Sequence, residues 1–440
     1  MKAVIRDERE MKDSGIEWIG KIPKAWGLRK AKYVADFNPK VTIKFDENLP
    51  IGYVPMDAVK LGYMEPLEHD YNSLSTGLTQ FQEDDIIMAK VTPCFENGEI
   101  AIAKNLAQGV GFGSSELFVY RTTEINQKYF FYYLQQLGFV DKATSTMTGT
   151  GGLKRISSYF ANNAEVTLPS TEEQRAIANY LDDRCSKIDT IIAEAKASIE
   201  EYNELKQAVI YEAVTKGLDK NVEMKDSGVE WIGVIPYDWH LEKINHVGVT
   251  SSGATPARHK EDEYFSNANI SWIKTLDLND GHVKYSSEKI TLEALNSSSC
   301  SLMPVGTVCV AMYGGAGTIG KSGILDFECA TNQAICSIVC NDKKQVGRYL
   351  QYQLQAMRSY WMKYAVGTRK DPNISQQTVA QMKVLVPPIS IQISIADYLD
   401  DKIMDLESLI SEKQSLIEDL EAYKKSLIYE VVTGKRKVVA

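Results

Sequence analysis

The sequence predicts an α+β protein built from two similar mixed α/β modules, each followed by a long helix. The first observation is a duplication, because residues 11–26 return at 224–239 with 12 of the 16 positions identical. The second is that short β-branched runs between the repeats are interrupted by Gly, Asn and Pro. The third is a helical apolar period at the end of each half. We expect the two helices to join the modules as an antiparallel coiled coil with pseudo-two-fold symmetry.

Two further repeats mark the later part of the duplicated unit. ANYLDDR at 178–184 returns as ADYLDDK at 396–402, and AVIYEAVT at 208–215 returns as SLIYEVVT at 426–433. The offset is 213 at the opening repeat and 218 at the later ones, so the second copy has a net five extra residues in its middle. Similar ends with dissimilar middles suggest one scaffold that carries two variable modules. The expected division is a first module at 1–165, a central helical region at 166–220, a second module at 221–385 and a distal helical region at 386–440.

Length and composition indicate a globular protein of several domains. A chain of 440 residues is too long for one core, and 44% of its residues are hydrophobic. No run approaches the ~20 apolar residues that a membrane span needs. The seven cysteines are odd in number and unpatterned, which points to a reducing compartment. We therefore expect a cytoplasmic protein without a membrane partner.

The net charge of −9 at first argues against a nucleic-acid partner. The charge is uneven, however, because residues 171–216 carry a net −4 and residues 389–433 a net −6. The rest of the chain has a net charge of about +1. The acidity therefore belongs to the predicted helices, and the near-neutral modules with their local basic clusters do not exclude nucleic acid.

Matching elements are expected in the two modules, with the same fold and different surface side chains. The matched pairs are strands at 85–90 and 307–312, strands at 116–121 and 334–339, and helices at 127–137 and 346–357. A short strand ended by proline closes each module, at 166–169 and at 384–388. Ser170 and Glu173 are then expected to form a capping box at the start of the first long helix. The second copy has Ile391 in place of Glu173, so the capping box is lost there.

Each long helix carries apolar residues at a heptad-like spacing, with a stutter near Tyr202 and Leu420. Because the other faces are charged, the simplest partner of each helix is the other helix, packed antiparallel. The alternative is that each helix packs only on its own module. About 30 helical residues would form a rod of ~45 Å. The seam residues expected in the coiled coil or in partner contacts are Ile188, Ile192, Ile199, Leu205, Leu406, Ile410, Ile417 and Leu427, with Tyr423 at the place that matches Leu205.

Residues 315–322 read GAGTIGKS, a formal match to the P-loop pattern G-x4-G-K-[ST]. A phosphate loop must open a helix whose N-terminal amides bind the phosphates. The segment that follows reads as strand and turn instead, and the first module lacks the pattern at the equivalent place. We interpret these glycines as a turn between strands.

No recognisable catalytic or metal-binding pattern is present. Five of the seven cysteines lie in the second module, and Cys336 and Cys340 fall on one side of a predicted strand. Their spacing does not recur as it does in a zinc ribbon, so we interpret them as core residues. Neither a methyltransferase signature nor a paired-carboxylate nuclease core nor a nucleophile–base arrangement stands out. We expect a non-catalytic chain without a metal or a bound cofactor.

Polar loops with glycine and basic residues are the candidates for DNA contact. TGTGGLKR at 148–155 and VGTRKDPN at 366–373 lie at matching positions, and TSSGATPARHK at 250–260 is similar. Arg and Lys can contact guanine, Asn can contact adenine, and glycine allows close approach to phosphate. A solvated surface loop explains any one of them, but recurrence in both modules favours DNA contact. The candidate DNA-binding residues are Lys90, Thr150, Lys154, Arg155, Arg258, Lys260, Thr368, Arg369, Lys370 and Asn373.

The W-I-G-x-I-P-x-x-W opening, the SGATP loop, the strand–Pro–helix start at 168–174 and the two long helices together resemble the specificity subunit of type I restriction-modification systems. The resemblance runs from about residue 11 to 433. It implies two target-recognition domains, each of which reads half of a bipartite double-stranded DNA site. The residues that match the opening motif, and that we take as structural, are Trp18, Gly20, Pro23, Trp26, Trp231, Gly233, Pro236 and Trp239.

The resemblance also implies partners. The helical regions would dock two DNA adenine methyltransferase subunits and, where present, restriction and translocase subunits. These partners would use S-adenosylmethionine and ATP. One departure is the second helix start, which keeps Gln392 but has Ile391 before it, so the two partner subunits need not dock equally. A ~45 Å rod spans about 13 base pairs, so helix length is expected to set the spacer between half-sites. The competing hypothesis is a non-DNA scaffold in which a coiled coil presents two protein-interaction modules.

Overall fold

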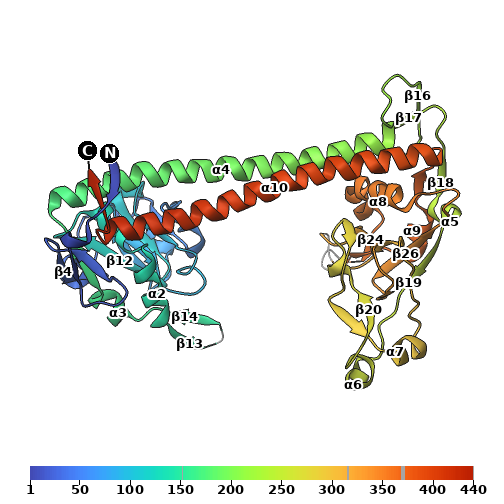
Figure 1. Ribbon diagram of the computed structural model, residues 1–440. Helices are drawn as coiled ribbons and strands as arrows, with labels where there is room; N and C mark the ends of the chain where they lie inside the picture. Colours follow the sequence, from blue (N-terminus) through green and yellow to red (C-terminus); the bar gives the residue numbers. More distant parts are fainter. Residues whose placement is uncertain (151, 315–316, 368–371, 440) are drawn as a thin grey trace. The chain divides into compact units, whose positions relative to one another are not determined.

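The structure is a computed structural model that divides into two compact units, each described here by itself (Figure 1). It describes residues 1–150, 152–314, 317–367 and 372–439, with Arg258 described by its backbone alone. Unit 1 comprises Met1–Lys196 and Gln414–Ala440, and unit 2 comprises Ala197–Lys413. Each unit therefore combines one module with part of both long helices, α4 (Thr171–Lys216) and α10 (Ile389–Val432).

Unit 1 is a mixed α/β module whose sheets pack against short helices. Its strands are β1 (Lys2–Ile5), β2 (Met11–Asp13), β3 (Lys21–Pro23), β4 (Gly27–Lys30), β5 (Ala35–Phe37), β6 (Ile51–Val54), β7 (Leu67–His69), β8 (Thr79–Gln82), β9 (Ile86–Ala89), β10 (Ile100–Ile102), β11 (Val110–Gly113), β12 (Leu117–Thr122), β13 (Thr148–Thr150), β14 (Leu153–Arg155), β15 (Glu165–Leu168) and β30 (Arg436–Val439). Its short helices are α1 (Gln127–Tyr133), α2 (Leu137–Ser145) and α3 (Ser158–Asn163). Over the described residues, the larger sheets have the orders β10-β9-β12-β5 and β7-β6-β11-β8.

Unit 2 has a related arrangement of sheets and short helices. Its strands are β16 (Met224–Asp226), β17 (Val234–Pro236), β18 (Leu241–Lys243), β19 (Gly248–Ser252), β20 (Ile270–Ile273), β21 (Gly281–Val283), β22 (Glu288–Ile290), β23 (Val308–Ala311), β24 (Ser322–Leu325), β25 (Ala330–Thr331), β26 (Ile335–Cys340), β27 (Val366–Gly367), β28 (Pro372–Asn373) and β29 (Lys383–Leu385). Its helices are α5 (Ile244–Val247), α6 (Glu261–Tyr264), α7 (Leu292–Ser297), α8 (Gly347–Ala356), the 3-10 helix η8 (Arg358–Lys363) and α9 (Gln376–Gln381). Within the part of the chain that is described, the larger sheets have the orders β19-β26-β23-β24-β21 and β22-β20-β25.

The matched strands of the two modules are confirmed. In unit 1 the strand β12 lies between β9 and β5, and in unit 2 the strand β26 lies between β23 and β19, in both cases antiparallel. The helix expected at 127–137 is shorter than predicted: α1 ends at Tyr133 and α2 begins at Leu137. The Gln136 side chain caps the new helix by accepting from the Gly138 N–H at 2.8 Å, which explains the break. The α+β class is confirmed.

The opening repeat forms a hairpin in each unit, β2–β3 and β16–β17, with the same register. Trp26, Trp231 and Trp239 of this repeat are buried, as a structural role requires. The tyrosines of the last repeat bind these hairpins. Tyr429 donates to the Ile19 carbonyl at 3.3 Å in unit 1, and Tyr211 donates to the Ile232 carbonyl at 3.1 Å in unit 2. The opening repeat and the last repeat therefore form the same hydrogen bond in each unit, which accounts for their similarity in the two copies.

The start of each long helix is held by a buried glutamine. In unit 1 the Gln174 amide donates to the Pro169 carbonyl at 3.0 Å, and its oxygen accepts from the Asn126 N–H at 2.7 Å. In unit 2 Gln392 makes the same two types of contact, with Pro387 and with Val346, both at 2.8 Å. Each glutamine thus ties a long helix to the start of α1 or α8. The retained Gln392 has an intramolecular role that does not need the missing acid.

The Ser170 half of the predicted capping box is confirmed, because the Ser170 hydroxyl accepts from the Glu173 N–H at 3.3 Å. The reciprocal bond from the Ser170 N–H to the Glu173 carboxylate is not formed among the described residues. The Glu173 carboxylate instead accepts from the indole N–H of Trp26 at 3.2 Å. The opening repeat and the helix start are therefore joined directly in unit 1.

The repeated YLDD motif fastens each long helix to its module. Tyr132 donates to Asp182 at 2.9 Å in unit 1, where Lys128 also binds this carboxylate at 2.5 Å. In unit 2 Tyr352 donates to Asp400 at 2.6 Å, and Arg348 forms an ion pair with the same aspartate. The module and the helix are thus linked by equivalent side chains in both copies.

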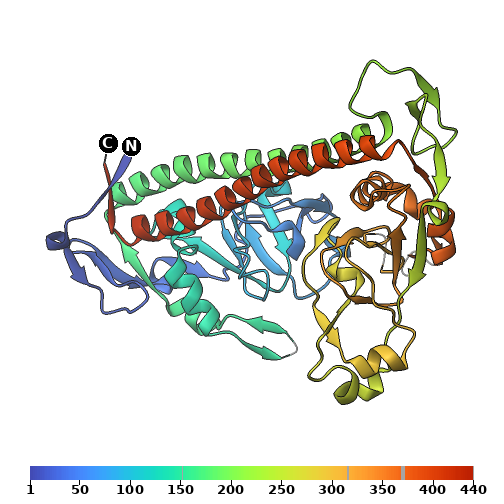
Figure 2. The same ribbon diagram turned by 45° about the vertical axis from the view of Figure 1, so that its right-hand side comes forward.

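The two long helices pack together within each unit, running antiparallel (Figures 1 and 2). Of the predicted seam residues, Ile188, Ile192, Leu406, Ile417 and Leu427 are buried, and Ile199 and Ile410 are partly buried. Because each helix packs on the other helix as well as on its module, the alternative in which each packs only on its own module is wrong. The helices are longer than expected, with 46 residues in α4 and 44 in α10.

The predicted seam is wrong at one equivalent pair of positions. Leu205 and Tyr423 are 47% and 48% exposed. The stutter shifts the buried position of each helix by one residue, to Lys206 and Lys424. Only 18% and 14% of these two lysine side chains are exposed. Their stems lie on the seam while their ammonium groups reach acids of the opposite helix, Glu407 at 2.5 Å and Asp189 at 2.6 Å.

Candidate nucleic-acid interface

The two predicted basic loops are short antiparallel hairpins. β13 pairs with β14 in unit 1, and β27 pairs with β28 in unit 2. The β13–β14 hairpin projects from the rest of its unit, with Thr150 and Lys154 exposed (Figure 1). Thr368, Arg369 and Lys370 lie outside the described residues. The hairpin form was not predicted, because neither segment has the alternating apolar pattern of a strand.

Both hairpins are attached to the central sheet by one backbone arrangement. In unit 1 the Lys90 N–H donates to the Glu116 carbonyl at 3.0 Å, and the Lys90 carbonyl accepts from Ile156 at 2.9 Å. In unit 2 the Met312 N–H donates to the Ala334 carbonyl at 2.7 Å, and its carbonyl accepts from Ile374 at 3.0 Å.

One isolated β-bridge in each unit extends this equivalence to a further pair of residues. Arg155 is paired with Val91 in unit 1, and Asn373 is paired with Tyr313 in unit 2. We call the three aligned positions of each module the hairpin frame. The frame residues are Lys90, Glu116 and Arg155 in unit 1, and Met312, Ala334 and Asn373 in unit 2. The backbone is therefore the same while the side chains differ in charge and size.

The frame of unit 1 is charged. The Glu116 carboxylate accepts from Nε and from Nη2 of Arg155, both at 2.8 Å. The hydrogen bonds from Arg155 lower the pKa of the Glu116 carboxyl, so the pair stays ionised in mildly acidic solution. Lys90 donates to the Ser115 carbonyl at 2.6 Å, and its ammonium lies 5.5 Å from the centre of the Phe118 ring. Two cations thus flank one carboxylate at the base of the hairpin.

Lys90 also borders a polar groove of about 300 Å³ in unit 1. The groove is lined by Asn38, Pro39, Lys40, Thr79, Gln80, Lys90, Ser115 and Leu117. Amide, hydroxyl and ammonium groups of this kind can donate to or accept from base edges and phosphates. The sequence did not single out Lys40, Gln80 or Glu116. Glu116 is the first residue of the strand predicted at 116–121, but its pairing with a residue 39 positions away is a long-range contact.

The SGATP loop of unit 2 packs inward. A Cβ on Gly253 would lie 1.8 Å from the Thr331 carbonyl oxygen, so only glycine fits. The next residue, Ala254, donates to the same carbonyl at 3.0 Å and accepts from the Trp272 indole at 3.1 Å. Lys260 forms an ion pair with Glu263 at 3.1 Å. A DNA contact by Lys260 stays a prediction, and the side chain of Arg258 is outside the described part.

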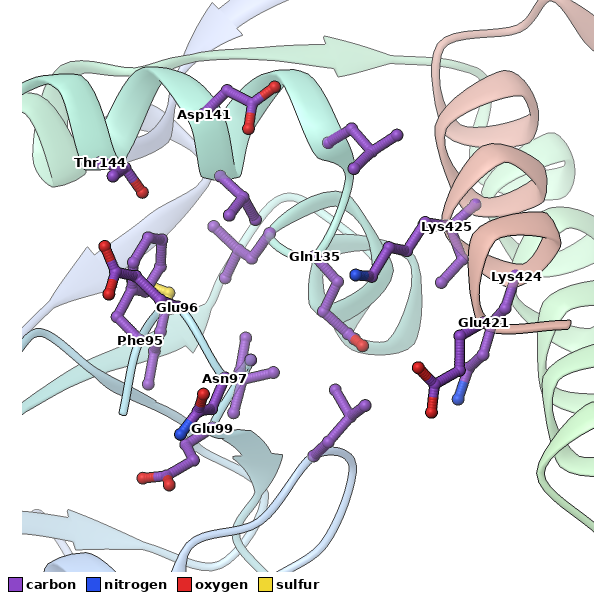
Figure 3. Close-up of a pocket in the computed structure, with 18 of the residues that line it drawn as sticks. Phe95, Glu96, Asn97, Glu99, Gln135, Asp141, Thr144, Glu421, Lys424 and Lys425 are labelled. Carbon is purple, nitrogen blue, oxygen red and sulfur yellow. The ribbon is translucent and has the colours of Figure 1, made fainter. Parts of the chain in front are cut away.

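A cavity of about 670 Å³ in unit 1 is lined by apolar side chains and by charged side chains of both signs (Figure 3). Glu96, Glu99 and Asp141 line it together with Lys424 and Lys425. A lining that carries so many carboxylates does not suit a polyanion. The groove beside the hairpin is therefore the better candidate for nucleic acid.

The interpretations of the GAGTIGKS segment and of the cysteines agree with the structure. Ser322 begins the strand β24 rather than a helix, so residues 317–322, the described end of the GAGTIGKS segment, do not open the helix that a phosphate loop needs. Gly315 and Ala316 lie outside the described residues. Cys309 and Cys336 are buried in the sheet, and burial raises the pKa of Cys336 to about 12.

Among the described residues there is no group of His, Cys, Asp and Glu suited to a metal ion. No helix in the described ranges is long and apolar enough to cross a membrane.

Comparisons with known proteins give a consistent result. The model of the type I restriction modification DNA specificity domain matches twice, at residues 23–201 and 236–418. The EcoAI type I restriction enzyme specificity subunit of Escherichia coli is 29% identical over 194 residues, which are 43% of this chain and 33% of that subunit. The MjaVIII specificity subunit of Methanocaldococcus jannaschii is 23% identical over 429 residues, with 95% and 94% of the two chains covered.

A solved structure from work on complex assembly and conformational transition of the type I R-M system has the same fold. Its TM-score is 0.74 at 14% identity, and 94% of this chain and 99% of that chain are covered. The two domain matches fall on the two modules and on parts of both long helices. The chain therefore belongs to the family of type I restriction-modification DNA specificity proteins.

Proposed function

We propose that this chain is the non-catalytic DNA-recognition subunit of a type I restriction-modification complex. Each module would read one half of a bipartite double-stranded site. The observation that carries the proposal is the hairpin frame, which has one backbone arrangement in the two modules but different side chains. Two readers built on one scaffold need a constant backbone and variable contact groups.

The candidate contact residues divide into two groups. In unit 1 they are Lys90, which lines the polar groove, and Thr150, Lys154 and Arg155 of the β13–β14 hairpin. In unit 2 they are Arg258, Lys260, Thr368, Arg369, Lys370 and Asn373. The exposed Lys154 suits a phosphate, whose contacts add affinity without sequence preference.

The partners that we propose are two DNA adenine methyltransferase subunits and, where present, restriction and translocase subunits. S-adenosylmethionine and ATP would be used by those partners, in the cytoplasm, with no cofactor bound by this chain. The long helices support docking of two copies of one partner. Leu205 and Tyr423 are exposed at equivalent positions of the two helices, so each helix offers an apolar side chain at the same place.

Salt-dependent binding tests the DNA part of the proposal. The chain assembled with its methyltransferase subunits should bind duplex DNA less tightly as salt rises, because phosphate contacts release counterions. Lys154→Ala should weaken binding about equally for all sequences and reduce the salt slope by about one. Lys437→Ala, an exposed lysine on β30, is the control and should change neither. Failure of the assembled complex to bind duplex DNA would favour the protein scaffold.

A further inference from the structure

We infer that Glu116 is a positioning residue that presents Arg155 to a guanine in the half-site of the first module. The inference rests on the proposed function and assigns one base contact within it. A guanidinium has two edges that can form paired hydrogen bonds, the Nε–Nη2 edge and the Nη1–Nη2 edge. Glu116 occupies the first of these with both carboxylate oxygens.

The second edge of Arg155 is available. The side chain is 46% exposed, and Nη1 has no hydrogen-bond partner among the residues that the structure describes. The Nη1–Nη2 edge is the one that can donate to O6 and N7 of guanine together. Because Glu116 already fixes the plane of the guanidinium, little side-chain freedom is left to lose when the base binds.

Glu116 is itself held firmly. Its N–H donates to the Ser114 hydroxyl at 3.2 Å, its carbonyl accepts from Lys90, and the strand β12 begins at the next residue. The orientation of Arg155 is therefore determined by the sheet rather than by the projecting hairpin alone.

The carboxylate also favours a base over a phosphate. A phosphate oxygen at the free edge of Arg155 would lie close to the negative charge of Glu116 and be repelled. A guanine brings two neutral acceptors, and its paired cytosine carries an N4 amino group that a carboxylate can accept from. The Arg155–Glu116 pair therefore suits a G·C pair better than the DNA backbone.

The second module provides the matched comparison. There the frame holds Met312, Ala334 and Asn373, with neither a carboxylate nor a cation. An asparagine can form paired hydrogen bonds with N6 and N7 of adenine. The side chains of the frame alone would therefore determine which base is preferred at one position of each half-site.

The experiment is a map of methylated sites from cells that express each variant with the methyltransferase subunits. Arg155→Ala should lower the preference for guanine about tenfold or more at one position of one half-site. Glu116→Ala should relax the same position partly. The combination of Lys90→Met, Glu116→Ala and Arg155→Asn transplants the second frame and should shift that position toward adenine.

The second half-site is an internal control, because it should be unchanged in every variant that folds and assembles. Lys154→Ala should reduce methylation without changing any base. A bipartite motif whose bases all survive Arg155→Ala would overturn the inference and leave the proposed function standing. A motif that relaxes at Arg155→Ala but not at Glu116→Ala would overturn the positioning role of Glu116. Absence of a bipartite motif for the unchanged chain would contradict the proposed function itself.

Discussion

A Gly320→Ala chain is expected to lose about 2–5 kcal/mol of the free energy of unfolding of unit 2. Gly320 has a φ of +74°, and an added Cβ would lie 2.0 Å from Cδ1 of the fully buried Trp361. The left-handed backbone alone costs about 1–2 kcal/mol for alanine. Displacing an indole in a packed core costs a further ~1–3 kcal/mol. Chemical denaturation followed by tryptophan fluorescence measures the loss.

Two controls lie in the same segment. Nothing lies within 4 Å of a Cβ built on Gly317, so Gly317→Ala should change the unfolding free energy by less than about 0.5 kcal/mol. Lys321→Ala should have a similarly small effect, and nucleotide should not raise the melting temperature of the unchanged protein. Stabilisation by nucleotide that Lys321→Ala abolishes would show instead that GAGTIGKS is a phosphate loop.

The second large effect is expected for Asp400→Ala, which should destabilise unit 2 by about 2–4 kcal/mol. The substitution removes the acceptor of the Tyr352 hydroxyl and one partner of Arg348 at once. Tyr352 is only 7% exposed, so its hydroxyl would be left without a partner in a nearly dry site. Urea denaturation compares the variant with the unchanged chain.

The neighbouring aspartate is the matched control. Asp401 is exposed in the same YLDD motif, and Asp401→Ala should change the unfolding free energy by less than about 0.5 kcal/mol. Asp182→Ala in unit 1 should resemble Asp400→Ala, because Tyr132 and Lys128 bind Asp182 in the same way. Equal effects of Asp400→Ala and Asp401→Ala would contradict the fastening role assigned to the first aspartate.

The duplication made much of the fold predictable. Segments that match in sequence adopt matching elements, and the local signals for β9, β12 and α8 are strong because each combines a clear period with β-branched or aromatic residues. The buried positions Ile192 and Ile417 follow from the heptad-like spacing in the same way. What the sequence predicted best is therefore what depends on local periodicity.

The errors lie where long-range contacts decide the structure. Lys206 and Lys424 were not expected on the seam, because a lysine there depends on an acid of the other helix, Glu407 or Asp189. The hairpin form of 148–155 depends on attachment to Lys90 and Thr92 rather than on its own apolar pattern. The pairing of Arg155 with Glu116 likewise joins residues that no local period connects.

The central claim is that two modules on one scaffold read a bipartite DNA site. The most direct measurement is single-molecule mapping of methylated bases in plasmid DNA from cells that express this chain together with its methyltransferase subunits. We predict a two-part motif with a fixed gap and one methylated adenine on each strand. If both proteins are expressed and assembled but methylate no new sites, the claim is wrong, and the scaffold hypothesis becomes the better account.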